Sequence, residues 1–386
     1  MRQVGNMKIA MIGHKAIPST RGGIETVLTN LCPLLVRAGN EVVCYNRSSD
    51  RIEPTFADEV RDGCFRGVRL KTARTLKRRG VSALIASFSA AFCSLFGRYD
   101  ILHFHAEGPA AAIFVPKLFG KKCVATVHGL DWQRDKWKHG FGAKYIMFGE
   151  RMIAKHADGI IVLSESAKTY FKETYGREAV VIPNGIAKPE KLDDRIIAEK
   201  FGLHKDGYIC VVARLTEEKG IHYLIEAFKQ LDTDKKLVIC GDSSDTDAYA
   251  AQLKEAARGC GNILFTGFIA GDTLVSMYSS AYLVCLPSKL EGMSISLLEA
   301  LAYGNAVLCS DIPENLSVCR DSAAFFRSGD TADLRDKLEL LLQDPARVGQ
   351  LRAVAADAVL RRFSWEKTAR ETLAYYEDVL KGANAT

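Results

Sequence analysis

The chain has 386 residues, of which 48% are hydrophobic and 25% charged, the balance of a globular protein with enough apolar residues for two domains. Its eleven cysteines are scattered singly without a C-x-x-C pair, which argues against a disulfide framework or a zinc site and indicates a reducing compartment. The net charge of +6 is uneven, because residues 1–182 carry 28 Lys and Arg against 16 Asp and Glu, whereas the remainder carries 24 against 30.

The first half alternates short apolar runs with helical stretches, a pattern typical of parallel α/β folds. The N-terminal residues run directly into the first strand without an apolar signal segment, so we expect no secretion signal. The amphipathic stretch from Ile24 to Ala38 predicts the first helix. The predicted strands of this half are residues 8–13, 41–46, 100–106, 123–129 and 159–164.

Two stretches between the second and third strands differ in charge. Residues 61–79 contain eight Arg or Lys and one acid, Asp62, which predicts contact with an anionic membrane surface, although a solvated loop is the alternative. Phe65 is the one aromatic residue in this stretch, which disfavours nucleic-acid binding through base stacking. The next run, residues 81–96, is uncharged but shorter than the roughly 20 apolar residues of a membrane span, so we expect a buried or interfacial helix. The predicted location is cytoplasmic and peripheral, on the inner leaflet of the plasma membrane.

A cluster of turn residues, Pro183, Asn184, Gly185 and Pro189, separates this half from a second alternating set. The final stretch, residues 363–380, predicts a helix that begins after a Ser364 cap. The chain therefore reads as two successive Rossmann-like domains. The predicted strands of the second half are residues 208–215, 236–242, 263–268, 281–288 and 305–311.

Ligands of open α/β sheets bind at the carboxyl ends of the strands, and informative residues follow the predicted strands. After the first strand, Gly22 and Gly23 precede a helix and would let a phosphate approach its free N–H groups, unless they form a simple turn. The G-x-G-x-x-G fingerprint is absent there, which disfavours a dehydrogenase.

The second half carries candidate groups for a diphosphate and for sugar hydroxyls. Arg214 and Lys219 follow its first strand and suit a diphosphate, although Glu217 and Glu218 offer local ion pairs instead. After the strand at 281–288, Glu291 lies in a loop and Glu299 lies inside a helix that starts at Ser294 or Ser296. Carboxylates accept hydrogen bonds from vicinal hydroxyls and helix-start amides favour anions, but a solvated helix face is the alternative.

Histidines and acids follow two strands of the first half. His128 and Asp131 end one strand as a proton-handling or hydroxyl-orienting pair, and Arg134 follows. His103 and His105 share one face of the preceding strand, where a packed histidine face is favoured over a metal site, and Glu107 follows. The D-x-D of residues 245–247 reads as a helix cap, so no metal site is predicted.

The motifs together resemble the family-4 retaining glycosyltransferases of the GT-B fold. The similarity runs over nearly the whole chain and rests on the Gly-Gly loop, IPNG, ARLTEEKG, GD, FTGF and the E-x7-E spacing of Glu291 and Glu299. The segments GGIETVL and VHGLDWQRDKW are similar to those of the bacterial branch of this family that builds surface polysaccharides. Rhamnosyltransferases that act on lipid-linked N-acetylglucosamine are prominent in that branch.

The resemblance implies two Rossmann-like domains facing across a cleft. Residues 1–183 with about 365–386 would form the acceptor domain, to which the last helix returns, and residues 184–364 the donor domain. The donor would be a dTDP- or UDP-sugar, the acceptor a lipid-diphosphate-linked saccharide, and neither cofactor nor metal would be needed. Retention would follow from same-face attack assisted by the leaving diphosphate.

The resemblance also implies a role for each motif residue. Asp131, with His128, would bind or deprotonate the acceptor hydroxyl. Gly292, Met293 and Ser294 depart from the Gly-Phe-Gly common in relatives, which leaves the choice of hexose open. The implied sets are Gly22, Gly23, Arg214 and Lys219 for the diphosphate; Glu291, Gly292, Met293 and Ser294 for the sugar; Glu299, Phe268 and Ile269 for ribose and base; and His128, Asp131, Glu107 and Arg134 on the acceptor side.

Three rival functions are compatible with the same residues. A transferase of the same fold could use a UDP-sugar or make a soluble disaccharide. A nucleotide-sugar epimerase would release an epimerised donor without any acceptor. A non-catalytic protein would bind the nucleotide sugar without turning it over.

Overall fold

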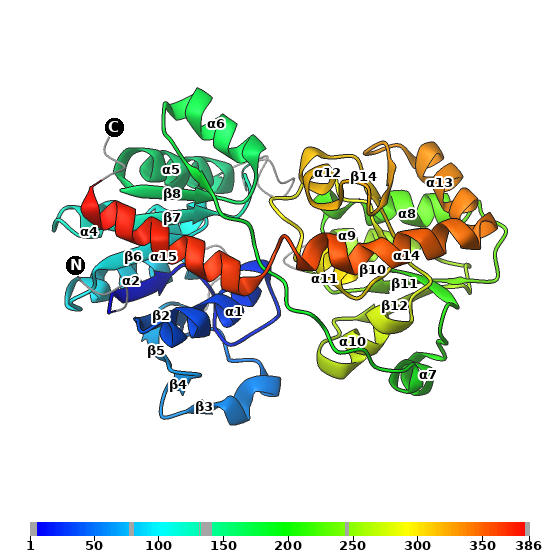
Figure 1. Ribbon diagram of the computed structural model, residues 1–386, viewed down its shortest axis with the longest axis horizontal. Helices are drawn as coiled ribbons and strands as arrows, with labels where there is room; N and C mark the ends of the chain where they lie inside the picture. Colours follow the sequence, from blue (N-terminus) through cyan, green and yellow to red (C-terminus); the bar gives the residue numbers. More distant parts are fainter. Residues whose placement is uncertain (1–5, 77–80, 131, 133–140, 244–246, 383–386) are drawn as a thin grey trace. The chain divides into compact units, whose positions relative to one another are not determined.

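The protein, described by a computed structural model over residues 6–76, 81–130, 132, 141–243 and 247–382, divides into two compact units. Unit 1 comprises Met1–Gly185 and Ser364–Thr386, and unit 2 comprises Ile186–Phe363. The sequence placed the two junctions after residue 183 and at about residue 365. Each unit is an α/β domain built on its own sheet (Figure 1).

Unit 1 contains a nine-stranded sheet in the order β3-β4-β5-β2-β1-β6-β7-β8-β9. All of its pairs are parallel except β3–β4 and β4–β5. The central strands are fully buried, as expected when helices cover both faces, and they are mainly apolar apart from His103 and His105 of β6 and Thr126 of β7. The strands are β1 Lys8–Ile12, β2 Glu41–Arg47, β3 Val60–Arg61, β4 Cys64–Phe65, β5 Val68–Ala73, β6 Ile101–His105, β7 Cys123–Val127, β8 Gly159–Val162 and β9 Val180–Val181.

Helices cover both faces of this sheet. Alternate residues of β2 show the two faces, since Val43 joins a core cluster with α2 while the Cys44 Sγ lies 3.7 Å from the Cys32 Sγ of α1. The C-terminal helix α15 packs against α1 and β8, which confirms its predicted return to the first domain. The helices are α1 Gly23–Arg37, η1 Pro54–Glu59, α2 Ser82–Leu95, α3 Glu107–Ala110, α4 Phe114–Lys117, α5 Phe141–His156, α6 Glu165–Tyr175 and α15 Trp365–Lys381.

Unit 2 contains a six-stranded, wholly parallel sheet in the order β12-β11-β10-β13-β14-β15, the doubly wound order of a Rossmann fold. Its core joins these strands to α8, α9, α13 and α14. The strands are β10 Tyr208–Val212, β11 Lys236–Cys240, β12 Ile263–Gly267, β13 Leu283–Leu286, β14 Val307–Ser310 and β15 Ala324–Phe326. The helices are α7 Arg195–Phe201, η4 Glu217–Lys219, α8 Ile221–Phe228, α9 Asp247–Ala256, α10 Gly271–Ser280, α11 Ile295–Ala302, α12 Pro313–Cys319, α13 Thr331–Gln343 and α14 Pro345–Leu360.

The predicted fold class is confirmed, and all ten predicted strands are present. The sequence missed β5 because Arg69 and Lys71 alternate with its apolar residues and point to solvent, so the stretch read as a basic loop. The short strands β3, β4, β9 and β15 were also missed. Within the described residues, no helix reaches the length and apolarity that crossing a membrane requires.

Candidate functional site

In unit 2 a partly buried ion pair lies at the carboxyl edge of the sheet. The Lys219 Nζ lies 2.6 Å from the Glu291 Oε1, and only 15% and 8% of the two side chains are exposed. Lys219 ends η4, after β10, and Glu291 follows β13, the neighbouring strand across the point where the strand order reverses. The sequence placed both residues at this edge but expected Lys219 to serve a phosphate, and it did not predict their contact.

Backbone contacts hold the two loops of this ion pair together. Gly220 has a positive φ of 65°, and a Cβ there would lie 2.1 Å from the Pro287 carbonyl oxygen, so only glycine permits this approach. The Lys289 N–H donates to the Glu218 carbonyl at 2.8 Å. Arg214 lies half-buried in the same loop as Lys219. The pair therefore sits on a rigid frame.

Glu299 lies inside α11, which begins after Ser294, one of the two predicted starts. The Ser294 side chain caps this helix by accepting a hydrogen bond from the Leu297 N–H at 3.3 Å. The Tyr278 hydroxyl donates to Glu299 Oε2 at 3.2 Å, and the Tyr278 ring stacks on Tyr303. Burial raises the pKa of Glu299 to about 7, against the effect of the Tyr278 hydrogen bond. The pKa of this carboxyl therefore lies close to neutral pH, and its ionised form can accept hydrogen bonds from hydroxyl groups.

The remaining predicted residues of unit 2 lie in loops at the same edge. Met293 and Ser294 are buried at the start of α11, and Gly292 is half-buried beside them. Phe268 and Ile269 follow β12, with 41% of Phe268 exposed. An exposed aromatic ring after an outer strand of this sheet is available for stacking on a planar group.

In unit 1 the glycine pair opens α1. Gly22 is the N-cap and Gly23 the first helical residue, so the free N–H groups of the helix lie beside them. A Cβ on Gly23 would meet no atom within 4 Å, whereas one on Gly22 would lie 2.1 Å from Glu25 Oε2. Space is therefore open next to Gly23.

Two buried carboxylates that the sequence did not single out hold the loop before α1. Glu25 accepts the Lys15 N–H at 2.8 Å, and Glu53 accepts the Thr20 N–H at 2.6 Å. Glu25 lies in the first turn of α1, just after the Gly-Gly pair. An acidic residue at this position favours a helix start, so the sequence offered a signal that Glu25 belongs to this loop. Glu53 lies in a connection after β2 with no local pattern, so only the fold could reveal its role.

Histidines gather at the carboxyl ends of β6 and β7. His105 Nδ1 lies 3.1 Å from His128 Nε2, and the rings of His103 and His105 lie 4.1 Å apart. His103 hydrogen-bonds the Thr126 and Tyr376 hydroxyls through its two ring nitrogens. Burial lowers the pKa of His103 to about 3 and that of His105 well below its usual value. These imidazoles are therefore neutral near pH 7, and they lead from α15 to His128 at the sheet edge.

The other predicted residues of unit 1 differ in how far the structure places them. Glu107 begins α3 and is fully buried. Asp131 and Arg134 lie outside the described residues, as does Asp245 of the D-x-D, while Asp247 begins α9. Within the described part of the chain, no three His, Cys, Asp or Glu side chains are grouped to hold a metal ion.

Known protein families match the two units of the chain separately. Residues 21–188 match the family described as Glycosyltransferase Family 4, and residues 193–358 match the one described as Glycosyl transferases group 1. The chain is a family-4 glycosyltransferase of the GT-B fold. The enzyme class predicted from the sequence, hexosyltransferase, is confirmed.

Relatives and solved structures match the glycosyltransferase over 73% to 97% of its length. The α-maltose-1-phosphate synthase of Mycolicibacterium smegmatis is 27% identical, covering 97% of this chain and 100% of that protein. The phosphatidyl-myo-inositol mannosyltransferase of Mycobacterium leprae is 28% identical over 73% of this chain and 74% of that protein. Sucrose-phosphate synthase of Thermosynechococcus elongatus superposes with a TM-score of 0.81 at 20% identity, covering 97% and 99% of the two chains. Anabaena Alr3699/HepE in complex with UDP-glucose superposes with a TM-score of 0.78 at 15% identity, covering 96% and 99%.

Proposed function

We propose that the glycosyltransferase moves a hexose or deoxyhexose, with retention of configuration, from a nucleotide-diphosphate sugar to a lipid-linked or saccharide acceptor in bacterial surface-polysaccharide synthesis. The observation that carries this proposal is the edge of unit 2, where Lys219, Glu291 and Glu299 lie on adjoining loops and a helix start. The M. leprae relative is named as a mannosyltransferase of phosphatidyl-myo-inositol, a lipid, which supports a lipid-linked acceptor.

The ion pair leaves Lys219 able to bind phosphate. An ammonium group has three N–H donors, and Glu291 accepts one of them, so two remain for diphosphate oxygens. In our proposal Arg214 adds a bidentate cation in unit 2, and Gly22 and Gly23 are the residues of unit 1 that would let a diphosphate approach the N-terminus of α1. Charge that develops on the leaving diphosphate would be stabilised by these groups, and this stabilisation assists same-face attack.

The sugar and nucleoside would use the residues around α11. Glu291, Gly292, Met293 and Ser294 would hold the transferred sugar, with Glu291 linking it to Lys219. Glu299 would accept hydrogen bonds from the ribose hydroxyls, and Phe268 and Ile269 would contact the base. A buried carboxyl with a pKa of about 7 gains its charge when two hydroxyl donors replace lost water.

The acceptor would bind to unit 1, where His128 and Asp131 would orient or deprotonate its hydroxyl, with Glu107 and Arg134 nearby. Behind His128, the imidazoles of His103 and His105 are neutral near pH 7 and add no charge to this edge, which suits a neutral hydroxyl. The reaction would need no cofactor and no metal ion.

Our specific proposal for the substrates is rhamnosyl transfer from dTDP-rhamnose to lipid-linked N-acetylglucosamine. It rests on the similarity of GGIETVL and VHGLDWQRDKW to the surface-polysaccharide branch. The second candidate is a UDP-sugar donor carrying glucose, galactose or N-acetylglucosamine, and it is favoured by the superposition on a protein that binds UDP-glucose.

A panel of dTDP-, UDP-, GDP- and ADP-sugars tests this proposal. We expect dTDP-rhamnose to raise the melting temperature most and to be consumed with lipid-linked N-acetylglucosamine, at a rate that a chelator does not change. Turnover with UDP-sugars alone would replace the donor. Release of an epimerised nucleotide sugar without acceptor, or binding without turnover, would overturn the transferase proposal.

A further inference from the structure

The helix α2 has two apolar faces. It packs against β1, β2 and β5 through small side chains, and its outer face repeats large or apolar residues every three or four positions. The buried inner residues are Ala86, Ser87, Ala90, Ala91 and Ser94. On the outer side Phe92, Cys93 and Phe96 are exposed, whereas Ile85 is half-buried and Phe88 packs, partly buried, against the core.

The outer face of α2 lacks the charges of an ordinary surface helix. No Asp, Glu, Lys or Arg occurs from Val81 to Gly97. Phe92 and Phe96 are 56% and 79% exposed, and their rings contact each other at 5.4 Å. A helix that covers a sheet needs only its inner face to be apolar, so the fold of unit 1 does not account for these exposed rings.

The apolar surface continues onto the next helix. Phe88 of α2 contacts Phe114 of α4 at 6.1 Å between ring centroids. One turn beyond Phe114, Leu118 and Phe119 are 78% and 65% exposed. Since α2 and α4 each precede one of the parallel neighbours β6 and β7, both helices end at the same edge of the sheet. The two helices also contact each other, and we call their exposed apolar residues at this edge, Phe92, Phe96, Leu118 and Phe119, the apolar ridge.

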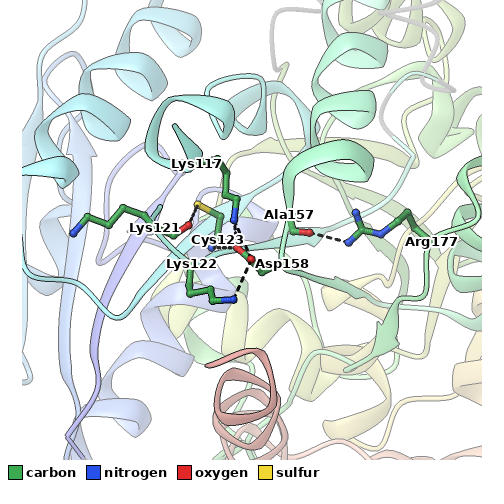
Figure 2. Close-up of polar contacts among 7 residues, drawn as sticks. All are labelled: Lys117, Lys121, Lys122, Cys123, Ala157, Asp158 and Arg177. Atoms are coloured by element: carbon green, nitrogen blue, oxygen red, sulfur yellow. Dashed lines mark hydrogen bonds and ion pairs between the residues drawn. The ribbon is translucent and has the colours of Figure 1, made fainter. Parts of the chain in front are cut away.

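Cations flank the apolar ridge. Figure 2 shows that Lys117 and Lys122 converge on Asp158, while Lys121 extends away from this group. Arg98, which follows α2, is exposed, and neither it nor Lys121 forms an ion pair with another residue in the described ranges. At the other end of α2, Arg74 is exposed and the Thr75 hydroxyl donates to the Ser82 carbonyl at 2.6 Å. Uncompensated positive charge thus lies at both ends of the helix.

We propose that the apolar ridge inserts into the headgroup region of an anionic phospholipid bilayer, with Arg74, Arg98 and Lys121 contacting lipid phosphates. Exposed apolar rings gain by leaving water, and flanking cations are attracted to an anionic leaflet, so the two parts act together. A symmetric pair of copies would bring the same cations face to face, which disfavours a dimer. The inference deepens the proposed function, since a lipid-linked acceptor requires a bilayer, and it adds α2 and α4 to the basic stretch at 61–79.

Flotation of the full chain with vesicles tests the ridge. We expect binding to phosphatidylcholine vesicles that contain phosphatidylglycerol, and much weaker binding to phosphatidylcholine alone or at high salt. The double substitution Phe96→Ser with Phe119→Ser should weaken binding at least about tenfold. Arg98→Gln with Lys121→Gln should weaken it about tenfold at low salt. The control is Leu340→Ser with Val354→Ser in unit 2, two apolar residues that are 55% and 47% exposed, which should bind like the unaltered protein.

Cys93 offers an independent readout within the ridge. Among the eleven cysteines, all of them described, it is the exposed one. A polarity-sensitive fluorophore on Cys93 should brighten when anionic vesicles are added and should not respond to phosphatidylcholine alone. A salt-insensitive or absent response would overturn the proposal.

Two further outcomes separate the ridge from the proposed function. Hydrolysis of the donor in solution should be unchanged by Phe96→Ser with Phe119→Ser, because neither residue belongs to the candidate site. If neither the unaltered protein nor any variant turns over a donor, the proposed function fails. Vesicle binding still tests the ridge in that case. The ridge proposal would be overturned if Phe96→Ser with Phe119→Ser left vesicle binding unchanged. It would also be overturned if the unaltered protein bound no vesicles but formed a concentration-dependent dimer that this double substitution abolished.

Discussion

In unit 2 the strands β10 and β13, on either side of the point where the strand order reverses, lead into loops that carry the Lys219–Glu291 ion pair. In unit 1, of the corresponding strands, β1 is followed after one residue by His14 and β6 ends in His105, and burial lowers the pKa of both histidines, so that both rings are neutral near pH 7. The two sheet edges have the same topology but different electrostatics. A fixed cation beside helix-start amides suits an anionic ligand, and neutral rings suit hydroxyl groups.

Removing the cation of unit 2 should have the largest effect. We expect Lys219→Ala to lower kcat/KM for the donor by a hundredfold or more, because a charged contact to phosphate is lost and Glu291 is left buried without its cation. Initial rates and donor binding measure this effect. The matched control is Arg327→Ala, which breaks an exposed ion pair with Asp330 and should change stability by less than about 1 kcal/mol. If Arg327→Ala lowered kcat/KM for the donor as much as Lys219→Ala does, the loss could not be attributed to the position of the Lys219–Glu291 pair.

A methyl group at the glycine pair of unit 1 tests whether this edge also approaches an anion. Gly23→Ala clashes with no protein atom, so we expect unchanged thermal stability and donor affinity about tenfold weaker, from one weakened hydrogen bond to a charged phosphate. Gly261→Ala, also in open space but in the connection before β12, should change neither quantity. Unchanged donor affinity in Gly23→Ala would separate unit 1 from diphosphate binding.

The buried carboxyl of unit 2 should make donor affinity depend on pH. With a pKa of about 7, Glu299 is mostly ionised at pH 8 and mostly protonated at pH 6. If the ribose requires the carboxylate, donor affinity should be about tenfold weaker at pH 6 than at pH 8. Titration calorimetry with Glu299→Gln should give weaker and nearly pH-independent binding. A pH dependence that persists in this variant would assign it to another group.

The two units should respond to acid in opposite directions. Burial lowers the pKa of His14 to about 4 and that of His103 to about 3, so between pH 6.5 and 4 the unfolded chain binds protons that folded unit 1 does not, and unit 1 loses stability as pH falls. Glu299 binds its proton in the folded state first, so its contribution to unit 2 rises between pH 7 and 4.5. Each group contributes up to about 1.4 kcal/mol per pH unit.

Hydrogen exchange measured by mass spectrometry at pH 7 and pH 5, corrected for intrinsic rates, can follow the two units separately. We expect protection in unit 1 to fall relative to unit 2. His14→Gln should reduce the pH sensitivity of unit 1, and Glu299→Gln should reduce that of unit 2. A uniform loss of protection in both units would contradict the opposite signs.

Local patterns were sufficient for much of the fold. Apolar runs such as KIAMI and KLVIC predicted their strands because a strand buried on both faces needs no alternation. The capping role of Ser294 and Ser364 could be read from a small polar residue before an apolar stretch. The strand β5 escaped notice because Arg69 and Lys71 face solvent, so its apolar residues did not form a continuous run.

The alternating fold, its two-part division and the residues that follow each strand could be read from the amino-acid sequence, because these depend on neighbours a few positions apart. The sequence also carried the motifs through which the family was identified. The contact of Lys219 with Glu291, 72 positions away, and the 3.1 Å approach of His105 to His128 became apparent from the folded chain alone. The folded chain also showed that α2 turns a second apolar face outward. Such contacts and pKa values depend on which strands become neighbours and on how much water they exclude, and no local pattern encodes either quantity.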